Sequence, residues 1–510
     1  MGSPSHRLAA AITVPSTGEF LVVRQPRPPS PPGEDEDYRR FVDSDLYDLP
    51  SAPLKPLVGE ARSEVAIAGA DSVTSLDLSR LDVSASLDQI FDQFGLPDGL
   101  RGEWRLLKYV EEAEFGPDAG VNTVFIVGSL ESKLDALPES CKWMTKESAL
   151  GMLSEAKPCS DRIGPNTYIG LLNSELSTAV PALPSQEYPP GITLVPMKSK
   201  TLQPFRTTNL VVVRATNGAA GSTCSDYFAC GDALLLDPGC SSQVHAELAD
   251  LVDSLPKKLL VLVTHHHHDH IEGLSVVQRC NPDAVLLTQQ NTMNRIGKGN
   301  WQIDYTPITG GEKICIGDQE LQVVFAPGHT DGHTGLLHVN TNTLIVGDHC
   351  VGYGSATLDS RSGGNMKDYF ETTYKFLDLS PHVLIPMHGR INLWPKHMLC
   401  GYLRNRRSRE ASILQSIENG AQTLFDIVSK TYSDVDRKLW IPASFNVRLH
   451  VDHLNSQHKL PKASCGAHFI FRWAVAYLQS RSSPGILAAG VLAGGLAIAC
   501  ALRRNSGKQS

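Results

Sequence analysis

Histidine and aspartate side chains crowd one short run of this chain, HHHHDH at residues 265–270, directly after an apolar segment. Alternate residues of an extended turn point the same way, so His265 and His267 can share one metal ion while Asp269 and His270 face a second. Imidazole suits zinc, and a carboxylate can join two ions. Two ions about 3.5–4 Å apart can hold a hydroxide at neutral pH and polarise a substrate oxygen. Taken alone, the run could also be a histidine-rich surface loop that binds metal adventitiously.

Further acidic and histidine residues follow other predicted strands. Asp237 comes directly after the apolar residues 234–236. Three more candidates follow the apolar runs 321–325, 344–346 and 383–385, and they are His329, Asp348 and His388. Packing alone gives no reason for imidazoles and carboxylates to recur at strand ends. The pattern therefore predicts a layered α/β fold whose site is assembled from loops at the ends of its strands.

These motifs resemble the metallo-β-lactamase superfamily over about residues 209–395. The resemblance implies an αββα sandwich and two zinc ions. It implies first-ion ligands His265, His267 and His329, second-ion ligands Asp269, His270 and His388, and a bridging Asp348. Asp269 is the implied catalytic residue. Asp237 is expected to support the ligands through hydrogen bonds. His333 is expected to support the ligands or to face the substrate, with a role as a metal ligand as the alternative.

Several features distinguish groups within this superfamily. Diiron oxygen-reducing members carry Glu where this chain has His267, but persulfide dioxygenases use one iron with a similar motif, which leaves the metal open. The roughly 40 residues between Asp348 and His388 are too few for the nuclease group with a large inserted domain. Glu272 departs from the Gly of many members. His266, His268 and His349 are interpreted as non-ligands: the first two are exposed and the third is a packing residue.

The region after His388 is predicted to be helical and resembles the winged-helix tail of the lactamase-beta-like endoribonuclease subfamily. The matching segments are YLRNRRSREASIL from 402, IENGAQTLFDIVSKTY from 417 and NVRLHVDHL from 446. The resemblance implies single-stranded RNA as a candidate substrate. A basic cluster is a possible nucleic-acid contact, with a solvated helix face as the alternative, and its members are Arg404, Arg406, Arg407 and Arg409.

The N-terminal region has an α+β pattern and weakly resembles a Nudix domain around residues 88–96, DQIFDQFGL. A Nudix box uses clustered glutamates to hold Mg²⁺. Gln89 and Gln93 occupy positions where acids are expected, and amides hold magnesium less well than carboxylates. The sequence therefore predicts a degenerate domain without pyrophosphatase activity.

The length of 510 residues predicts several domains. The expected order is a Nudix-like α+β domain at 1–173, a Pro-rich linker at 174–196, the hydrolase domain at 197–395 and a winged-helix-like domain at 396–465. A net charge of −8 argues against a general polyanion binder. The 11 cysteines form no Cys-x-x-Cys pair, which indicates a reducing compartment.

An apolar run without charges extends over residues 485–502 and is flanked by Arg481, Arg503 and Arg504. Eighteen residues just span a bilayer core as an upright helix. This predicts a single-pass C-terminal anchor with the catalytic domains in the cytosol. The target organelle stays open among mitochondrial, plastid and peroxisomal surfaces.

The sequence thus predicts a zinc-dependent hydrolase and leaves its substrate open between single-stranded RNA and a small ester or thioester. A thioesterase of the glyoxalase II type is the nearest enzymatic alternative, although its glutathione-binding tail is not recognisable here. A membrane-tethered scaffold with a vestigial site is the non-enzymatic alternative. The complete ligand set argues against the scaffold. The oligomeric state cannot be predicted.

Overall fold

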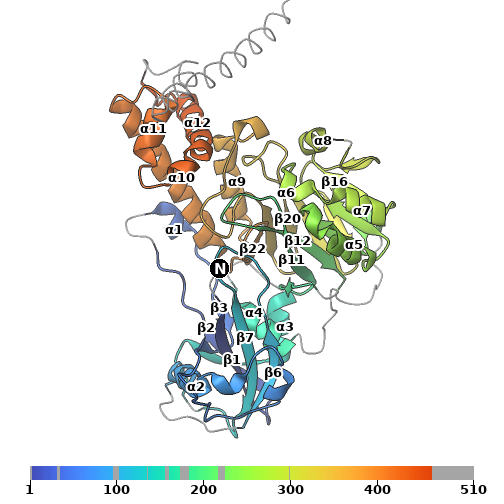
Figure 1. The fold of residues 1–510 in the computed structure, drawn as a ribbon, viewed down its shortest axis with the longest axis vertical. Helices are drawn as coiled ribbons and strands as arrows, with labels where there is room; N and C mark the ends of the chain where they lie inside the picture. Colours follow the sequence, from blue (N-terminus) through green and yellow to red (C-terminus); the bar gives the residue numbers. More distant parts are fainter. Residues whose placement is uncertain are drawn as a thin grey trace, which may run out of the picture. The chain divides into compact units, whose positions relative to one another are not determined.

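The computed structural model describes residues 3–30, 35–95, 103–134, 136–154, 160–172, 183–215, 224–297 and 299–461. The chain divides into two compact units, which are coloured along the sequence in Figure 1. The first comprises residues 1–326, 332–356 and 372–400. The second comprises residues 327–331, 357–371 and the segment from 401 onward.

A nine-stranded sheet occupies the N-terminal part of the first unit. A turn at residues 15–18 separates the first two strands, which pair antiparallel. Helix α2 (Val83–Asp92) packs on one face of the sheet through Leu87, Ile90 and Phe91. The strands are β1 (Ser5–Val14), β2 (Glu19–Arg24), β3 (Leu46–Asp48), β4 (Ser51–Leu54), β5 (Ile67–Ala68), β6 (Trp104–Val110), β7 (Val121–Ser129), β8 (Cys141–Thr145) and β9 (Arg162–Ile163).

Two further sheets form a sandwich in the middle of the chain (Figure 1). The seven-stranded sheet has, in spatial order, β10 (Gln186–Glu187), β11 (Ile192–Lys198), β12 (Thr207–Arg214), β14 (Ala233–Leu236), β15 (Leu259–Leu262), β16 (Val285–Thr288) and β17 (Tyr305–Pro307). The six-stranded sheet has β13 (Ala229–Gly231), β18 (Lys313–Ile316), β19 (Gln319–Phe325), β20 (Thr334–His338), β21 (Thr343–Gly347) and β22 (Val383–Pro386).

The alternation of side chains along each strand explains the layers. In β12, Val211 and Val213 face the six-stranded sheet, while Leu210 and Val212 face outward. The outward face is covered by α5 (His245–Asp253) and α7 (Leu274–Cys280), whose apolar residues share one core cluster with it (Figure 1). Because both faces are buried, the strands are almost entirely apolar and polar side chains appear only where they end.

Two strands lie partly within the segment 174–196 that the sequence suggested as a linker. Strand β11 pairs with β12 over seven residues, from Ile192 opposite Val213 to Lys198 opposite Thr207. Strand β10 pairs with β11. The chain therefore enters the sandwich sheet before residue 197.

The second unit is helical where it is described. Its helices include the first part of α9 (Met366–Asp378), α10 (Pro395–Glu418), which starts in the first unit, α11 (Leu424–Thr431) and α12 (Trp440–Ser456). Thr423 and Asp426 form a reciprocal capping box that satisfies backbone N–H groups at the start of α11. Ile413, Ile427, Val428 and Val447 join these helices in one core.

The predicted membrane anchor is contradicted. Among the residues that the structure describes, none belongs to a helix long and apolar enough to cross a bilayer. The single-pass anchor and the membrane location based on it are therefore not supported. The run at 485–502 itself lies outside the described residues.

Candidate metal centre

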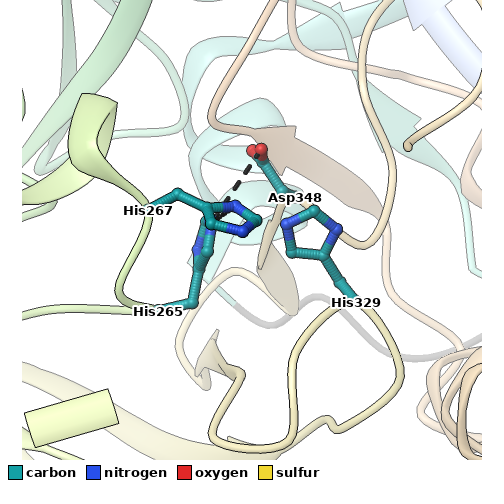
Figure 2. A group of neighbouring side chains, drawn as sticks. All are labelled: His265, His267, His329 and Asp348. Carbon is teal, nitrogen blue, oxygen red and sulfur yellow. Dashed lines mark hydrogen bonds and ion pairs between the residues drawn. The ribbon is translucent and has the colours of Figure 1, made fainter. Parts of the chain in front are cut away.

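Segments at the ends of β14, β15, β19, β21 and β22 bring the predicted acidic and histidine residues together. Ligand atoms of His265, His267, His329 and Asp348 lie within 4.8 Å of one another (Figure 2). The same limit holds for Asp269, His270 and His388, and for Asp237 with His265 and His270. The residues expected from spacing alone are thus gathered into adjoining clusters.

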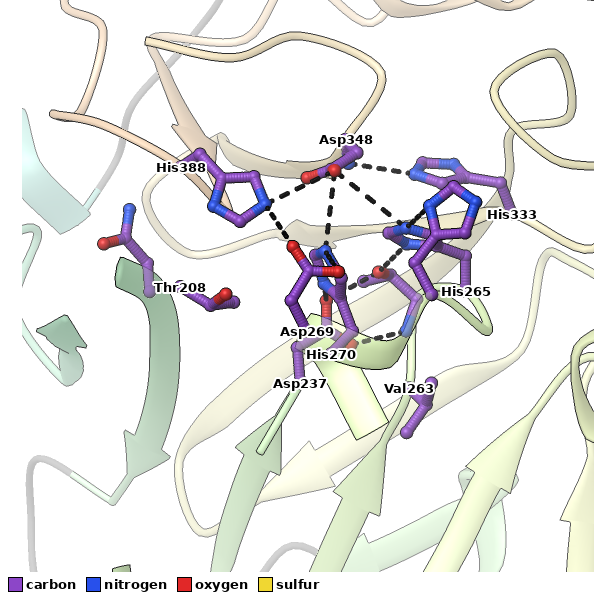
Figure 3. A network of polar contacts seen from close by, with 12 residues as sticks. Thr208, Asp237, Val263, His265, Asp269, His270, His333, Asp348 and His388 are labelled. Carbon is purple, nitrogen blue, oxygen red and sulfur yellow. Dashed lines mark hydrogen bonds and ion pairs between the residues drawn. The ribbon is translucent and has the colours of Figure 1, made fainter. Parts of the chain in front are cut away.

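Asp237 is the buried centre of a hydrogen-bond network beneath these clusters (Figure 3). Its backbone has a φ of +47°, which Asp tolerates better than most residues. One carboxylate oxygen accepts from the Thr264 N–H at 2.7 Å, and the other accepts from the Thr264 hydroxyl at 2.6 Å and from His270 Nδ1 at 2.9 Å. Asp237 therefore anchors the histidine run on both sides, at Thr264 directly before it and at His270, its last residue.

The hydrogen bonds fix the tautomers of three histidines. His388 Nδ1 donates to the Thr207 carbonyl at 2.9 Å, because a carbonyl can only accept. His270 Nδ1 likewise donates to Asp237. The Thr264 hydroxyl gives its proton to Asp237 and therefore accepts from His265 Nδ1 at 3.0 Å. When each ring is neutral, this leaves the lone pair on Nε2, which is the form that ligates metal.

These Nε2 atoms face one carboxylate oxygen. Asp348 Oδ2 lies 3.4 Å from His388 Nε2, 3.5 Å from His270 Nε2 and 4.0 Å from His265 Nε2 (Figure 3). Asp269 adds a second carboxylate, with Oδ2 3.3 Å from His388 Nε2 and Oδ1 3.8 Å from His270 Nε2. Asp348 is thus placed where a bridging ligand would be.

The charges of the site favour a bound cation. Burial lowers the pKa of His270, but the carboxylates of Asp348, Asp269 and Asp237 outweigh it and raise that pKa well above its usual value. Burial raises the pKa of Asp348, yet His388 and His270 hold it well below its usual range. Without a metal ion, the positive charge that balances these carboxylates would have to come from protons on the imidazole rings. A divalent cation supplies the same charge and leaves the nitrogens free to ligate.

The positions of two ring nitrogens are compatible with a shared metal ion. His265 Nε2 and His267 Nδ1 are 3.0 Å apart. Two nitrogens bound to one tetrahedral zinc, each at about 2.0–2.1 Å, would be roughly 3.3 Å apart. Among the described residues, buried His270 Nε2 has no hydrogen-bond partner. A buried imidazole nitrogen facing two carboxylates without such a partner fits a metal ligand.

His333 supports the site from behind. Its Nδ1 donates to the Ala326 carbonyl at 3.0 Å, and its Nε2 accepts from the Asp348 N–H at 3.2 Å. Burial lowers the pKa of His333 to about 4, which agrees with the neutral ring that both bonds require. Gly347 makes this approach possible, because a Cβ there would lie 2.3 Å from His333 Nε2.

The remaining histidines and Glu272 lie around the clusters. His349 is buried, bonds the Thr373 hydroxyl at 2.8 Å and packs its ring edge on Phe376. Glu272 accepts from Lys200 Nζ at 2.7 Å and lies 3.2 Å from His268 Nδ1. Sequence reasoning assigned no role to Thr264, although its position directly before His265 was the available signal.

The four arginines of the basic cluster have different environments. Arg404 and Arg407 are exposed, whereas Arg406 is 3% exposed. The Arg406 guanidinium lies 4.9 Å from the Tyr369 ring centroid, and Nη1 donates to Asn446 Oδ1 at 3.3 Å. Arg409 Nη1 donates to the Thr431 carbonyl at 2.6 Å and its guanidinium covers the Tyr432 ring. Arg406 is thus packed inside the second unit, where it cannot meet an external phosphate.

Arg406 also supports the loop that carries His329. Tyr369, against which Arg406 packs, lies so close to Gly328 that a Cβ on Gly328 would be 2.5 Å from the Tyr369 Cα. The Asn365 N–H donates to the Gly328 carbonyl at 3.0 Å. Gly328 directly precedes His329, so the stacked pair Arg406–Tyr369 holds the backbone next to a candidate ligand.

We expect Arg406→Ala to lower the free energy of unfolding by about 1–3 kcal/mol, because it removes a buried hydrogen bond and the packing of the side chain. Metal affinity should fall as the His329 loop loosens, and Arg406→Lys should recover part of both losses. The measurements are thermal unfolding and competition with a chelator. Arg407→Ala, on the exposed face, is the matched control and should change neither quantity. Equal effects of both substitutions would contradict this role.

Comparisons with known proteins agree with this geometry. Residues 223–388 match the metallo-β-lactamase superfamily, and residues 423–473 match the β-lactamase-associated winged helix domain. A β-lactamase-like protein 2 homologue of Drosophila melanogaster is 26% identical over 242 residues, which cover 44% of this chain and 80% of that protein. A hydroxyacylglutathione hydrolase of Yersinia enterocolitica is 28% identical over 227 residues, which cover 44% and 81%.

Among solved structures, a metallo-β-lactamase family protein from Thermus thermophilus is similar at 17% identity and a TM-score of 0.43, covering 53% of this chain and 94% of that one. The chain carries a domain of the metallo-β-lactamase superfamily, followed by the winged-helix domain associated with that superfamily. It is therefore an enzyme of a hydrolase superfamily. Neither family match reaches the N-terminal region, so the Nudix-like relationship is not supported.

Proposed function

We propose that this protein is a two-metal-ion hydrolase, with zinc as its metal, that cleaves a small-molecule ester or thioester. The observation that carries the proposal is the anchoring of three imidazoles through Nδ1, which leaves their Nε2 atoms facing the carboxylates of Asp348 and Asp269. The thioester class is supported by the similarity to hydroxyacylglutathione hydrolases. Single-stranded RNA is less favoured because Arg406 is buried and the charge of the chain is −8.

Under this proposal His265, His267 and His329 would hold one ion, Asp269, His270 and His388 would hold the second, and Asp348 would contribute to both sites. Two such ions supply a water activated at neutral pH and polarise a carbonyl oxygen. The Asp269 carboxylate is 15% exposed, so it can also accept a hydrogen bond from the attacking water and aim it at the substrate. Asp237 and His333 keep the ligands in place while this happens.

We expect the purified full chain to contain about two metal ions, because two separate ligand groups are present. Metal analysis by mass spectrometry on unchelated protein checks this number. Reconstitution with zinc or with iron, followed by turnover assays, identifies the active metal. A content of one ion or none in folded protein would contradict the two-metal site.

The substrate class is tested with the zinc-loaded full chain on three probes, namely an S-acylglutathione thioester, a single-stranded RNA oligonucleotide and a chromogenic β-lactam. The expected result is thioester turnover that is lost on chelation and restored by zinc. RNA cleavage without thioester turnover would overturn the substrate class and leave the metal site standing. No turnover and no bound metal would favour a vestigial site.

A further inference from the structure

A second cavity lies away from the metal centre, between the N-terminal sheet and the seven-stranded sheet of the sandwich. Its volume is about 590 Å³, within the range of sites for small organic molecules. Both walls belong to the first compact unit. None of the candidate metal ligands lines the cavity. It is therefore a separate site.

The two walls are firmly joined, so the cavity is part of a packed core. Arg162 at the end of the N-terminal sheet is 3% exposed and donates to the carbonyls of His382 and Leu393 at 2.6 and 2.5 Å. Leu393 itself lines the cavity. One core cluster extends across this junction, with Phe125 of β7 on one side and Leu194 of β11 on the other. Ligand sites are common where two domains meet in this way.

Strand register places two cations and an aromatic ring on the same wall. Lys108 of β6 is paired with Phe125 of β7, and Arg7 of β1 is paired with Thr123 of β7. Paired residues share a face of the sheet, as do residues two apart, so all four side chains face the cavity that they line. The N-terminal region also contributes the amide of Asn166 and the apolar side chain of Ile169, and the seven-stranded sheet contributes Gln186, Glu187 and Thr193.

The charges that line the cavity are unevenly paired. Glu112 accepts from Arg390 Nε and Nη2 at 2.5 and 3.1 Å, so these two charges neutralise each other. Glu187 accepts from the Tyr168 hydroxyl at 3.2 Å and from the Gly191 N–H at 3.1 Å, and these neutral donors do not offset the charge of its carboxylate. Glu111 also lines the cavity and is exposed. Among the described residues, the side chains of Arg7 and Lys108 have no hydrogen-bond or ion-pair partner. These two cations are therefore available to a ligand, in a lining that has three cationic and three acidic side chains.

We propose that this cavity binds a small molecule with one carboxylate and an apolar body. The carboxylate would pair with Lys108 and Arg7 through charge-assisted hydrogen bonds, and the apolar body would lie along Phe125 and Ile169. Lys108 is half-buried, so its ion pair would be screened less than one at the open surface. This site does not depend on the proposed hydrolase function.

The test uses the metal-stripped full chain and two probes of the same chain length, octanoate and octan-1-ol. Stripping is needed because a carboxylate could also bind metal ions at the hydrolytic centre. Isothermal titration calorimetry should show one octanoate per chain and binding of octan-1-ol that is at least about tenfold weaker, since the alcohol lacks the charge. Equal binding of both probes, or no binding of octanoate, would overturn the proposal.

Four variants locate the site. Lys108→Glu should weaken octanoate binding by about tenfold or more, because it places a like charge beside the carboxylate. Lys55→Glu makes the same charge change at an exposed position outside the cavity lining and should leave binding unchanged. Asp269→Ala should also leave it unchanged. Lys108→Gln, with thermal unfolding measured beside it, separates lost binding from lost folding. Binding that survives Lys108→Glu, or that disappears with Asp269→Ala, would contradict the assignment.

Discussion

Asp269→Ala is expected to abolish hydrolysis while the fold survives. Asp269 would perform two jobs, since its carboxylate would ligate one ion and would also orient the attacking water. Each of these functions lowers the activation free energy by several kcal/mol, and each 1.36 kcal/mol changes the rate about tenfold. We therefore expect kcat/KM to fall on the order of a thousandfold or more. Thermal stability should change less, because the side chain lies on the short helix α6 (His268–Ile271) at the site and is partly exposed.

The measurement is steady-state turnover with zinc in excess, together with metal analysis of the variant. Asp269→Asn helps to separate the two jobs, because it keeps the shape of the side chain and removes its charge. Asp92→Ala, an exposed position on α2, is the matched control and should keep full activity. If Asp92→Ala abolished turnover and Asp269→Ala did not, the chemistry would belong to the N-terminal region.

Asp237→Ala is expected to produce the largest loss of stability. The substitution leaves the Thr264 N–H, the Thr264 hydroxyl and His270 Nδ1 without their buried acceptor. A hydrogen bond to a charged group contributes about 1.5–3 kcal/mol, and alanine at a φ of +47° adds strain of about 1 kcal/mol. We expect unfolding free energy to fall by about 4 kcal/mol or more, with loss of metal binding.

Asp237→Asn separates these effects. Its amide oxygen can still accept from Thr264 N–H, and asparagine tolerates the positive φ, so most of the fold should survive. Its NH₂ group cannot accept from His270, which frees that ring to turn, so metal binding should still weaken. Urea unfolding of metal-free protein and chelator competition measure the two quantities. The control is Asp283→Ala at an exposed loop position, and similar losses there would contradict the central role of Asp237.

The candidate ligands could be predicted from sequence because the strands before them are buried on both faces. Apolar runs such as 259–263 and 383–385 carry no polar residue, so a histidine or aspartate directly after such a run stands out. The tautomers could not be predicted in this way. They depend on acceptors distant in the chain, such as the Thr207 carbonyl, which lies 181 residues before His388.

Other expectations failed where one sequence pattern is compatible with more than one secondary structure. Four-residue apolar runs such as β16 resemble buried helix segments, so that strand was not predicted. The prolines before Ile192 suggested a linker, so the start of β11 was not predicted. Arg406 appeared to belong to a basic surface because neighbouring arginines are dense in sequence. On a helix, residues two apart lie about 200° apart, so Arg404 is exposed while Arg406 is buried.

The early entry of the chain into the seven-stranded sheet has a consequence for shortened forms of this protein. A fragment beginning at residue 197 would lose most of β11, and the backbone N–H and C=O groups along one side of β12 would be left open to solvent. An open strand edge flanked by valine and leucine is a template for pairing with another chain. Such a fragment would therefore tend to self-associate and aggregate, although every candidate metal ligand would still be present in it.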